Sequence, residues 1–590
     1  MEENNMYYTT ERNAQIVISL LKAHNIKKIV ASPGTTNICL IASLQHDPFF
    51  EIYSSVDERS AGYIACGLAA ESGEPVVLSC TGATASRNYM SALTEAYYRK
   101  LPILVITSSR RSIYIGHNID QITDRTVLPN DVVKLSVQMP LVHDNDSEWA
   151  DIISANKAML ELNHHGCGPV HINLETAYSF DFSVRKLTKT QAIFRYENDK
   201  NMPDIPLGRV AIHVGTHLKW SEELTRTVET FCEKYNAIVV CDQTSNYKGK
   251  YKIFANFAAQ QELYTSIIKK VDLLIDLGYI TASKYKIDTK EVWRVNPDGE
   301  IRDTFKKMHY IFEMEEYDFF KYYIEKENKT NTEFWQECCK EEEMLAELQN
   351  QIIERLPFSN IWIASQTAKS IPENSILYLG IQNSLRSWNF FDVLPEVTCY
   401  SNTGGYGIDG IMSSALGTSL VSSEKLNFCI LGDLSFFYDM NVLGNRHVSN
   451  NLRIMVINNG EGVEFKLPTN PGAMFGNDTG KFISAKGHYG NKSSVLVKHY
   501  AEDLGFSYIS ASSKEEYLRN VEVFVSVKVL DKPIIFEVFT KSEDDVEALQ
   551  IMRRAKDERV TTSKDKVKCI IKGVLGEKGT NTIKSFLNKD

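Results

Sequence analysis

Short apolar runs of strand length alternate with helix-length segments along most of the chain. Near the start, the pattern predicts strands at residues 28–31, 75–79 and 103–107, and helices at residues 11–24 and 58–71. Strands that are separated by helices pair in parallel, because the chain crosses back before each new strand. The alternation recurs in two later blocks, so we expect an α/β fold with three doubly wound parallel-sheet domains.

A polar linker and a charged helical connector separate the three blocks. We place domains at residues 1–185, 186–350 and 351–545, followed by a basic helical tail at residues 546–590. A chain of 590 residues is long enough for about three or four domains.

Composition narrows the class of protein. Hydrophobic residues make up 43% and charged residues 24%, as in ordinary globular proteins. The net charge of −10 does not favour a large nucleic-acid surface. The eleven cysteines show no C-x-x-C spacing, so neither a zinc site nor a disulfide framework is expected. The start of the chain has no basic segment followed by an apolar one, as a signal peptide would have, and no apolar run approaches the roughly 20 residues of a membrane-spanning helix. We therefore expect a cytoplasmic protein without membrane or nucleic-acid partners.

Two predicted strand ends in the third block carry oxygen-bearing side chains. Asp433 follows the strand 428–431, and Asn459 comes 26 residues later at the end of another apolar strand. Parallel α/β sheets bind ligands at these carboxyl ends. A carboxylate, an amide oxygen and the carbonyl of Glu461 suit Mg²⁺ or Ca²⁺, and the Ser435 hydroxyl with nearby amides can hold phosphate. A G-D-x-S sequence alone is common in loops, so the prediction depends on the second strand end, at Asn459. The candidate residues are Gly432, Asp433, Leu434, Ser435, Asn459 and Glu461.

This pair of strand ends resembles the diphosphate motif of thiamine-diphosphate (ThDP) enzymes. The resemblance implies that Asp433 and Asn459 bind Mg²⁺ and that Glu461 contributes its carbonyl. It also requires a carboxylate against the aminopyrimidine of ThDP, in an apolar pocket that raises its pKa. Glu58 fits, since it follows a strand and begins a helix of small residues. The ordinary alternative is an acid that complements the dipole at a helix start.

The same resemblance implies further cofactor residues in two glycine-containing loops. Residues 81–88 resemble the family's loop beside the pyrimidine, and residues 402–410 the loop whose bulky apolar side chain keeps ThDP bent. An ordinary strand–helix turn would explain these glycines equally well. The candidates are Thr84, Asn88 and Ile408.

Within the family, several strings are similar to the 2-succinyl-5-enolpyruvyl-6-hydroxy-3-cyclohexene-1-carboxylate (SEPHCHC) synthases of menaquinone biosynthesis. Those enzymes decarboxylate 2-oxoglutarate and add the resulting acyl anion to isochorismate. The strings are residues 32–34 (SPG), 57–59 (DER), 168–173 (GPVHIN), 383–385 (NSL), 407–410 (GIDG) and 432–435 (GDLS).

The departures from that group concern substrate-binding arginines. At three positions where the synthases have arginines, this chain has Thr36, Thr403 and Trp388. Arg110 matches a further arginine of the synthases, and Arg386 lies near the replaced position at Trp388. Because such arginines bind substrate carboxylates, their replacement predicts a different substrate pair. The candidate substrate residues are Ser32, Thr36, Arg110, Ser384, Arg386, Thr403 and Phe465.

The loop 116–121 supplies two more candidates. Gln121 matches by position a family glutamine near the reacting carbon, and His117 could shuttle protons near neutral pH. A lone loop histidine is more often simply solvated. We assign both residues to catalysis together with Glu58.

We therefore expect ThDP- and Mg²⁺-dependent decarboxylation of a 2-oxo acid, with transfer of the acyl-anion equivalent to a carbonyl or enone acceptor. One alternative is a true SEPHCHC synthase with relocated arginines, such as Arg386, Arg111 or Arg87. Another is a non-catalytic ThDP-fold regulatory subunit, which the presence of Glu58 and Asp433 disfavours. Family architecture joins these two residues across subunits, which implies a homodimer or homotetramer. The central domain could bind FAD, as in some relatives, or nothing.

Overall fold

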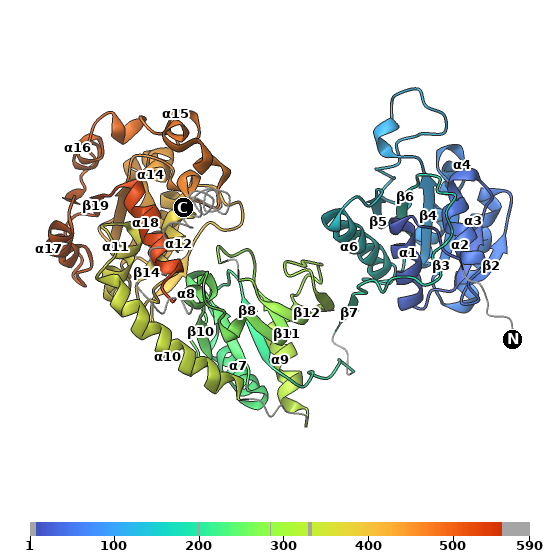
Figure 1. Cartoon of the computed structure of the whole chain (residues 1–590), viewed down its shortest axis with the longest axis horizontal. Coiled ribbons are helices and arrows are strands. Elements are labelled where there is room, and N and C mark those ends of the chain that lie inside the picture. The colour runs from blue at the N-terminus through green and yellow to red at the C-terminus, as the bar shows by residue number, and fades with distance from the viewer. Residues whose placement is uncertain (1–6, 198–200, 284, 328–332, 557–590) are drawn as a thin grey trace, which may run out of the picture. The chain divides into compact units, whose positions relative to one another are not determined.

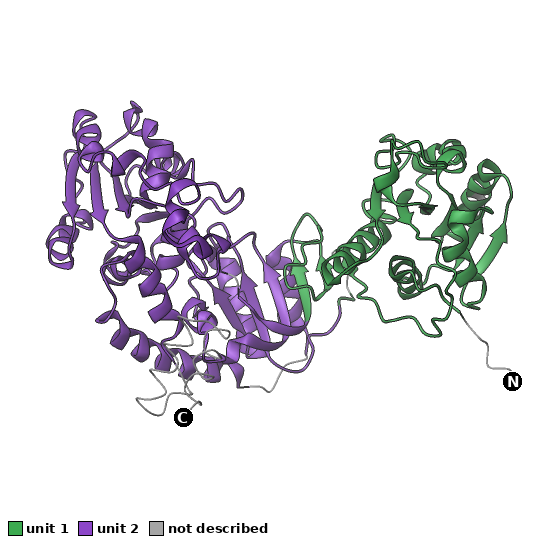
Figure 2. Ribbon diagram, turned by 45° about the horizontal axis from the view of Figure 1, so that its top comes forward, with its two compact units in different colours: residues 1–202, 291–314 green, residues 203–290, 315–590 purple. Residues whose placement is uncertain are grey.

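The structure is a computed structural model that describes residues 7–197, 201–283, 285–327 and 333–556 (Figure 1). It contains three sheets of six, seven and six strands, and helices flank them. Every strand pairing in these sheets for which a register is defined is parallel, which confirms the predicted α/β class. The chain divides into two compact units, residues 1–202 with 291–314, and residues 203–290 with 315–590 (Figure 2).

The first sheet has the order β2-β1-β3-β4-β6-β5. Alternate residues of its strands enter two separate cores, because successive strand side chains point to opposite faces. Ile29 and Val77 pack in one core with α1, α2 and α6, whereas Val30 and Leu78 pack in the other with α3 and α5. The elements are α1 Arg12–Ala23, β1 Lys28–Ala31, α2 Ile38–Gln45, β2 Glu51–Ser54, α3 Glu58–Ser72, β3 Val76–Thr81, α4 Ala83–Asn88, α5 Met90–Tyr98, β4 Ile103–Ser109, β5 Leu135–Met139, α6 Asn145–Glu161 and β6 Val170–Glu175.

The second sheet has the order β10-β9-β8-β11-β12-β13-β7. Its strand order reverses between β8 and β11, where doubly wound folds bind dinucleotides. Here an antiparallel bridge joins Thr216 to Tyr279, and a Cβ on Gly215 would lie 1.9 Å from the Tyr279 carbonyl oxygen. The backbone segments that follow β8 and β11 thus lie in direct contact, and FAD binding by the central domain stays an open prediction. The elements are β7 Phe194–Tyr196, β8 Val210–Val214, α7 Glu222–Tyr235, β9 Ile238–Cys241, β10 Lys252–Phe254, α8 Asn256–Gln260, β11 Lys270–Leu277, β12 Asp288–Val295, β13 Met308–Phe312, α9 Glu316–Glu325 and α10 Phe334–Ile353.

The third sheet has the order β15-β14-β16-β17-β19-β18, and its strand order reverses between β14 and β16. Gly432, the last residue of β16, pairs with Ile457 near the end of β17, so the two motif-bearing strand ends are neighbours. The elements are α11 Asn360–Thr367, β14 Ile376–Leu379, α12 Asn383–Trp388, β15 Thr398–Tyr400, α13 Ile411–Val421, β16 Asn427–Gly432, α14 Asp433–Asp439, β17 Leu452–Asn458, α15 Thr479–Phe482, α16 Leu496–Asp503, β18 Ser507–Ala511, α17 Lys514–Phe524, β19 Ile534–Phe539 and α18 Ser542–Arg553.

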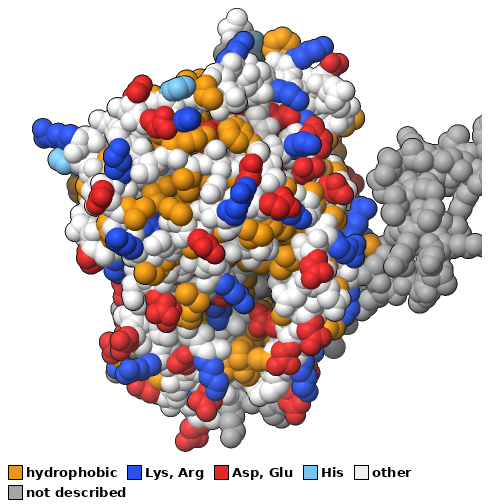
Figure 3. All heavy atoms as spheres, turned by 90° about the vertical axis from the view of Figure 1, so that its left-hand side faces the viewer, with side chains coloured by type: hydrophobic (Ala, Val, Ile, Leu, Met, Phe, Trp, Pro, Cys, Tyr) orange, Lys and Arg blue, Asp and Glu red, His pale blue; other side chains and the backbone are white. Residues whose placement is uncertain are grey.

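The predicted tail 546–590 begins inside α18, which buries Ala548, Leu549 and Met552. The remainder of the tail, residues 557–590, lies outside the described residues. None of the helices that the structure describes is long and apolar enough to cross a membrane. On the face drawn in Figure 3, basic and acidic side chains are interspersed rather than gathered by sign.

Candidate active site

A cavity of about 210 Å³ lies at the carboxyl edge of the third sheet. The ends of β16 and β17 supply part of its wall, as the motif spacing predicts. Thr403 is not among its lining residues; this side chain is buried and its hydroxyl lies 3.0 Å from the Thr216 hydroxyl. The sequence-predicted residues that the cavity brings together are Ser384, Ile408, Gly432, Asp433, Leu434, Ser435, Asn459, Glu461 and Phe465.

Asp433 is a buried carboxylate at the start of α14, with an exposed fraction of 4%. Burial raises its pKa to about 7, although the backbone N–H of Gly460 donates to it at 3.2 Å. No Lys or Arg of the described residues forms an ion pair with it. A Cβ on Gly432 would meet no atom within 4 Å, so the space beside the carboxylate is open. A divalent cation would supply positive charge beside this carboxylate.

The Asn459 side chain is oriented by Asp545, a residue that the sequence motifs missed. The Asn459 Nδ2 atom donates to Asp545 Oδ2 at 3.1 Å, and its Oδ1 atom accepts the Glu461 N–H at 3.3 Å, so Oδ1 is the atom oriented as an acceptor for a ligand. Asp545 also accepts the backbone N–H of Asn360 at 2.7 Å and Nδ2 of Asn383 at 3.4 Å. Burial raises the pKa of Asp545 to about 6. Because Asp545 lies 86 residues after Asn459, on α18, no local pattern could reveal this contact.

The Glu461 side chain already forms hydrogen bonds with other residues of the protein. Its carboxylate accepts hydrogen bonds from Lys466 at 2.5 Å, Ser542 at 2.7 Å and Ser484 at 2.8 Å. Burial raises the pKa of Glu461, but these hydrogen bonds outweigh burial and leave the pKa below its usual value. Glu461 therefore has only its main-chain carbonyl to offer to a metal, which agrees with the role that the family resemblance implies.

Ser435 joins the diphosphate motif to the loop at Ile408. The Ser435 hydroxyl donates to the Ile408 carbonyl oxygen at 2.6 Å, and both residues line the cavity. The oxygens of Asp433 and Asn459, the open space at Gly432 and the apolar Ile408 side chain match the donor set and shape that ThDP and Mg²⁺ need.

The two candidate substrate arginines are both paired with acids. Arg386 forms an ion pair with Glu464, which lines the cavity. Arg110, in the first unit, bonds Asp120 through two nitrogens at 2.9 and 3.2 Å and donates to the Tyr178 hydroxyl at 2.7 Å. Among the described residues, the cavity lining includes no Lys or Arg.

Glu58 lies at the first position of α3 and is half-buried. The Asp57 side chain caps this helix by accepting the Ser60 N–H at 2.7 Å. Asn88, a predicted cofactor residue, donates from Nδ2 to Glu58 Oε2 at 2.9 Å, so the structure brings these two residues together. Thr84, also a predicted cofactor residue, is exposed.

The other predicted residues of the first unit differ in exposure. His117 and Gln121 are exposed in their loop, and Gln121 has a left-handed backbone φ of 56°. Ser32 and Thr36 are buried, and the Thr36 hydroxyl donates to the Ser108 carbonyl oxygen at 2.7 Å. Thr36 is therefore held by backbone in this single chain.

Comparison with known proteins places the chain in a family. Residues 12–128 match the family "Thiamine pyrophosphate enzyme, N-terminal TPP binding domain". The SEPHCHC synthase of Bacteroides fragilis is 31% identical over 570 residues, covering 92% of this chain and 98% of the relative. Those of Phocaeicola vulgatus and Flavobacterium johnsoniae are 30% and 28% identical, with the same coverage. The chain therefore belongs to the thiamine-diphosphate enzymes, in the family that contains the SEPHCHC synthases.

Proposed function

We propose that this protein is a cytoplasmic, Mg²⁺-dependent ThDP enzyme that decarboxylates a 2-oxo acid and transfers the acyl-anion equivalent to a carbonyl or enone acceptor. The observation that carries the proposal is the cavity in which Asp433, buried and without a paired cation, lies near the oriented amide of Asn459. A buried carboxylate without a cationic partner is costly unless a metal ion compensates it.

Each residue has a role that follows from its contacts. Asp433, Asn459 and the Glu461 carbonyl would hold Mg²⁺, while Leu434 and Ser435 would border the diphosphate. ThDP, when bound, supplies the electron sink for the carbon that loses CO₂. Glu58 would hold a proton against the pyrimidine ring, and Asn88 keeps its carboxylate in place.

A second copy of the chain would complete the site. Large apolar side chains near Glu58 are exposed in the single chain, namely Tyr53 at 41%, Val56 at 79%, Tyr63 at 47% and Ile64 at 43%. Such a group on one strand and the following helix is typical of an interface. A homodimer, or a homotetramer built from it, would bury these side chains and give Glu58 the apolar surroundings that its role requires.

The substrate pair is the finer part of the proposal. A dicarboxylic donor such as 2-oxoglutarate needs a cation for its distal carboxylate. Both Arg110 and Arg386 are already neutralised, by Asp120 and Glu464. We therefore favour a donor other than 2-oxoglutarate. The SEPHCHC synthase reaction, with 2-oxoglutarate and isochorismate, is the second candidate, because relatives with that name match over 98% of their length.

The test is CO₂ release by the purified protein with ThDP and Mg²⁺. The panel contains pyruvate, 2-oxoglutarate, and phosphono- and sulfo-substituted pyruvates, each with and without isochorismate. Release from an acid other than 2-oxoglutarate, absent in Glu58→Gln, supports the first candidate. Release that requires 2-oxoglutarate together with isochorismate supports the second. No release from any acid, despite tight ThDP binding, would contradict both and favour the non-catalytic subunit.

A further inference from the structure

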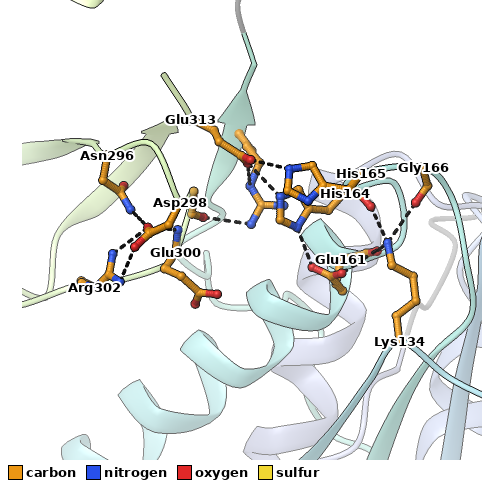
Figure 4. A network of polar contacts seen from close by, with 12 residues as sticks. Lys134, Glu161, His164, His165, Gly166, Asn296, Asp298, Glu300, Arg302 and Glu313 are labelled. Carbon is orange, nitrogen blue, oxygen red and sulfur yellow. Dashed lines mark hydrogen bonds and ion pairs between the residues drawn. The ribbon is translucent and has the colours of Figure 1, made fainter. Parts of the chain in front are cut away.

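Two adjacent histidines and a glutamate converge at the C-terminal end of α6 (Figure 4). His164 Nε2 lies 2.8 Å from Glu313 Oε2, and His165 Nε2 lies 2.6 Å from Glu313 Oε1. Glu313 directly follows β13, and all three residues belong to the first compact unit. The three ligand atoms lie within 4.8 Å of one another. The cluster takes no part in the ThDP chemistry proposed above.

The two ring nitrogens of His164 lie between two carboxylates. His164 Nδ1 lies 2.9 Å from Glu161 Oε2, within hydrogen-bond distance. The Nε2 atom of the same ring faces the Glu313 carboxylate, which is 92% buried. A metal ion bound here would take the place of a proton between Nε2 and the carboxylate, because metal binding to imidazole releases protons. A carboxylate that orients a histidine in this way is the usual second-shell partner of a zinc-bound imidazole.

The surrounding contacts hold the turn that carries the histidines. Lys134 Nζ donates to the carbonyl oxygens of Glu161 at 3.0 Å and Gly166 at 2.9 Å, and also to that of His164. His165 has a left-handed backbone φ of 45°, and the two imidazole rings stack with centroids 3.8 Å apart. A ligand would therefore find both rings already in place.

Two cations lie near the cluster and must be weighed. Arg195 Nε is 3.5 Å from Glu313 Oε2, and its Nη2 donates to the Gly299 carbonyl at 3.0 Å. Lys134 lies 3.2 Å from Glu161 Oε1 and shares its charge with three carbonyl oxygens at the helix end. Arg195 approaches only one of the two Glu313 oxygens. Because a carboxylate has about four lone-pair positions, Glu313 can bond Arg195 and a metal together.

We propose that His164, His165 and Glu313 bind one Zn²⁺ ion, through Nε2 of each imidazole and one carboxylate oxygen. Two nitrogens and one oxygen are a donor set that zinc prefers, and a water molecule would complete the tetrahedron. The ion would join the three side chains and fasten the end of β13 to the end of α6. Cysteine spacing could not predict such a site, since the glutamate lies 148 residues after His165.

The test measures zinc bound by the full-length protein. The protein is saturated with ThDP and Mg²⁺, so that the Asp433 site is filled, then dialysed against micromolar free zinc and analysed by inductively coupled plasma mass spectrometry. We expect about one zinc per chain in the wild type, and an affinity at least about tenfold lower in His165→Ala. Because the His165 side chain is 69% exposed, this substitution leaves packing nearly intact.

The matched control is His46→Ala, which removes an exposed histidine outside the cluster and should retain the zinc. Glu161→Ala keeps all three ligands but should weaken binding about tenfold, because His164 loses its orienting acceptor. Cobalt bound in place of zinc should show the intense visible bands of tetrahedral coordination in the wild type and not in His165→Ala. Absence of zinc from the wild type, or equal binding by His165→Ala and His46→Ala, would overturn the proposal.

Discussion

Asp545→Asn tests whether a buried carboxylate on α18 sets the metal site. Asp545 Oδ2 accepts the Asn459 amide at 3.1 Å, and its Oδ1 accepts the Asn360 N–H at 2.7 Å. An asparagine would keep the bond to Asn360 but present its NH₂ group to the NH₂ group of Asn459. The Asn459 amide would then turn over and direct a donor, rather than Oδ1, at the cation.

The magnitude follows from the loss of an orienting contact. Such partners are worth about 10–100-fold in metal affinity, or about 1.4–2.7 kcal/mol. We expect Asp545→Asn to raise the Mg²⁺ concentration for half-maximal ThDP binding by about that factor, with binding restored at high Mg²⁺. The assay is ThDP titration followed by intrinsic fluorescence over a series of Mg²⁺ concentrations.

The matched control is Asp544→Asn, which removes the same charge one residue away on the same helix. Its Mg²⁺ dependence should equal that of the wild type, which separates orientation from net charge. Thermal unfolding of both variants without ligands checks that the fold is retained. A Mg²⁺ dependence of Asp545→Asn within about twofold of the control would refute the reasoning, because the orienting contact would then contribute nothing measurable.

Four further substitutions probe other parts of the structure. Glu58→Gln should lower kcat by at least about 100-fold while ThDP affinity changes little, and full activity would contradict its role. Asp433→Ala should abolish Mg²⁺-dependent ThDP binding by calorimetry; unchanged affinity would reject the metal site. Glu464→Gln should free Arg386 and lower the KM for 2-oxoglutarate relative to pyruvate, whereas an unchanged ratio would exclude this pair from donor selection. Burial, followed by the nearby charge of Glu175, raises the pKa of Asp151 in the folded protein to about 7. Ionisation of this carboxyl therefore lowers the stability of the fold progressively as the pH rises from about 4 towards 7. Asp151→Asn should therefore raise the Tm at pH 8 and leave it nearly unchanged at pH 4, and an equal rise at both would refute this linkage.

The fold was predictable because its signal is local and repeated. The strand predicted at residues 28–31 is β1, and the helix predicted at residues 58–71 is α3 with one more residue. Apolar periodicity reports on which faces are buried, and a parallel sheet follows from the alternation itself. The register of β16 and β17 then brings Asp433 and Asn459 to one edge, as their strand-end positions predict.

The contacts that tune the site were not predictable in the same way. Asp545 reaches Asn459 from 86 residues away, and Glu313 reaches His165 across 148 residues. Each contact depends on how separate elements pack, and neither partner belongs to a recognisable motif. The buried contact of Thr403 with Thr216 depends on packing in the same way, and the substrate role predicted for Thr403 stays a prediction.

The ion pairs of the two arginines explain why family membership leaves the substrate open. A substrate carboxylate binds an arginine well only if the guanidinium is not already neutralised. Arg110 is paired with an acid ten residues along the chain, and Arg386 with one 78 residues along. Each acid therefore compensates the charge of its arginine. In the proposed reaction, a donor carboxylate that bound either arginine would have to displace the acid paired with it, whereas a donor without a second carboxylate would leave that pair intact. Identity over most of the chain therefore establishes the family, whereas donor choice in the proposed reaction would depend on whether these ion pairs open.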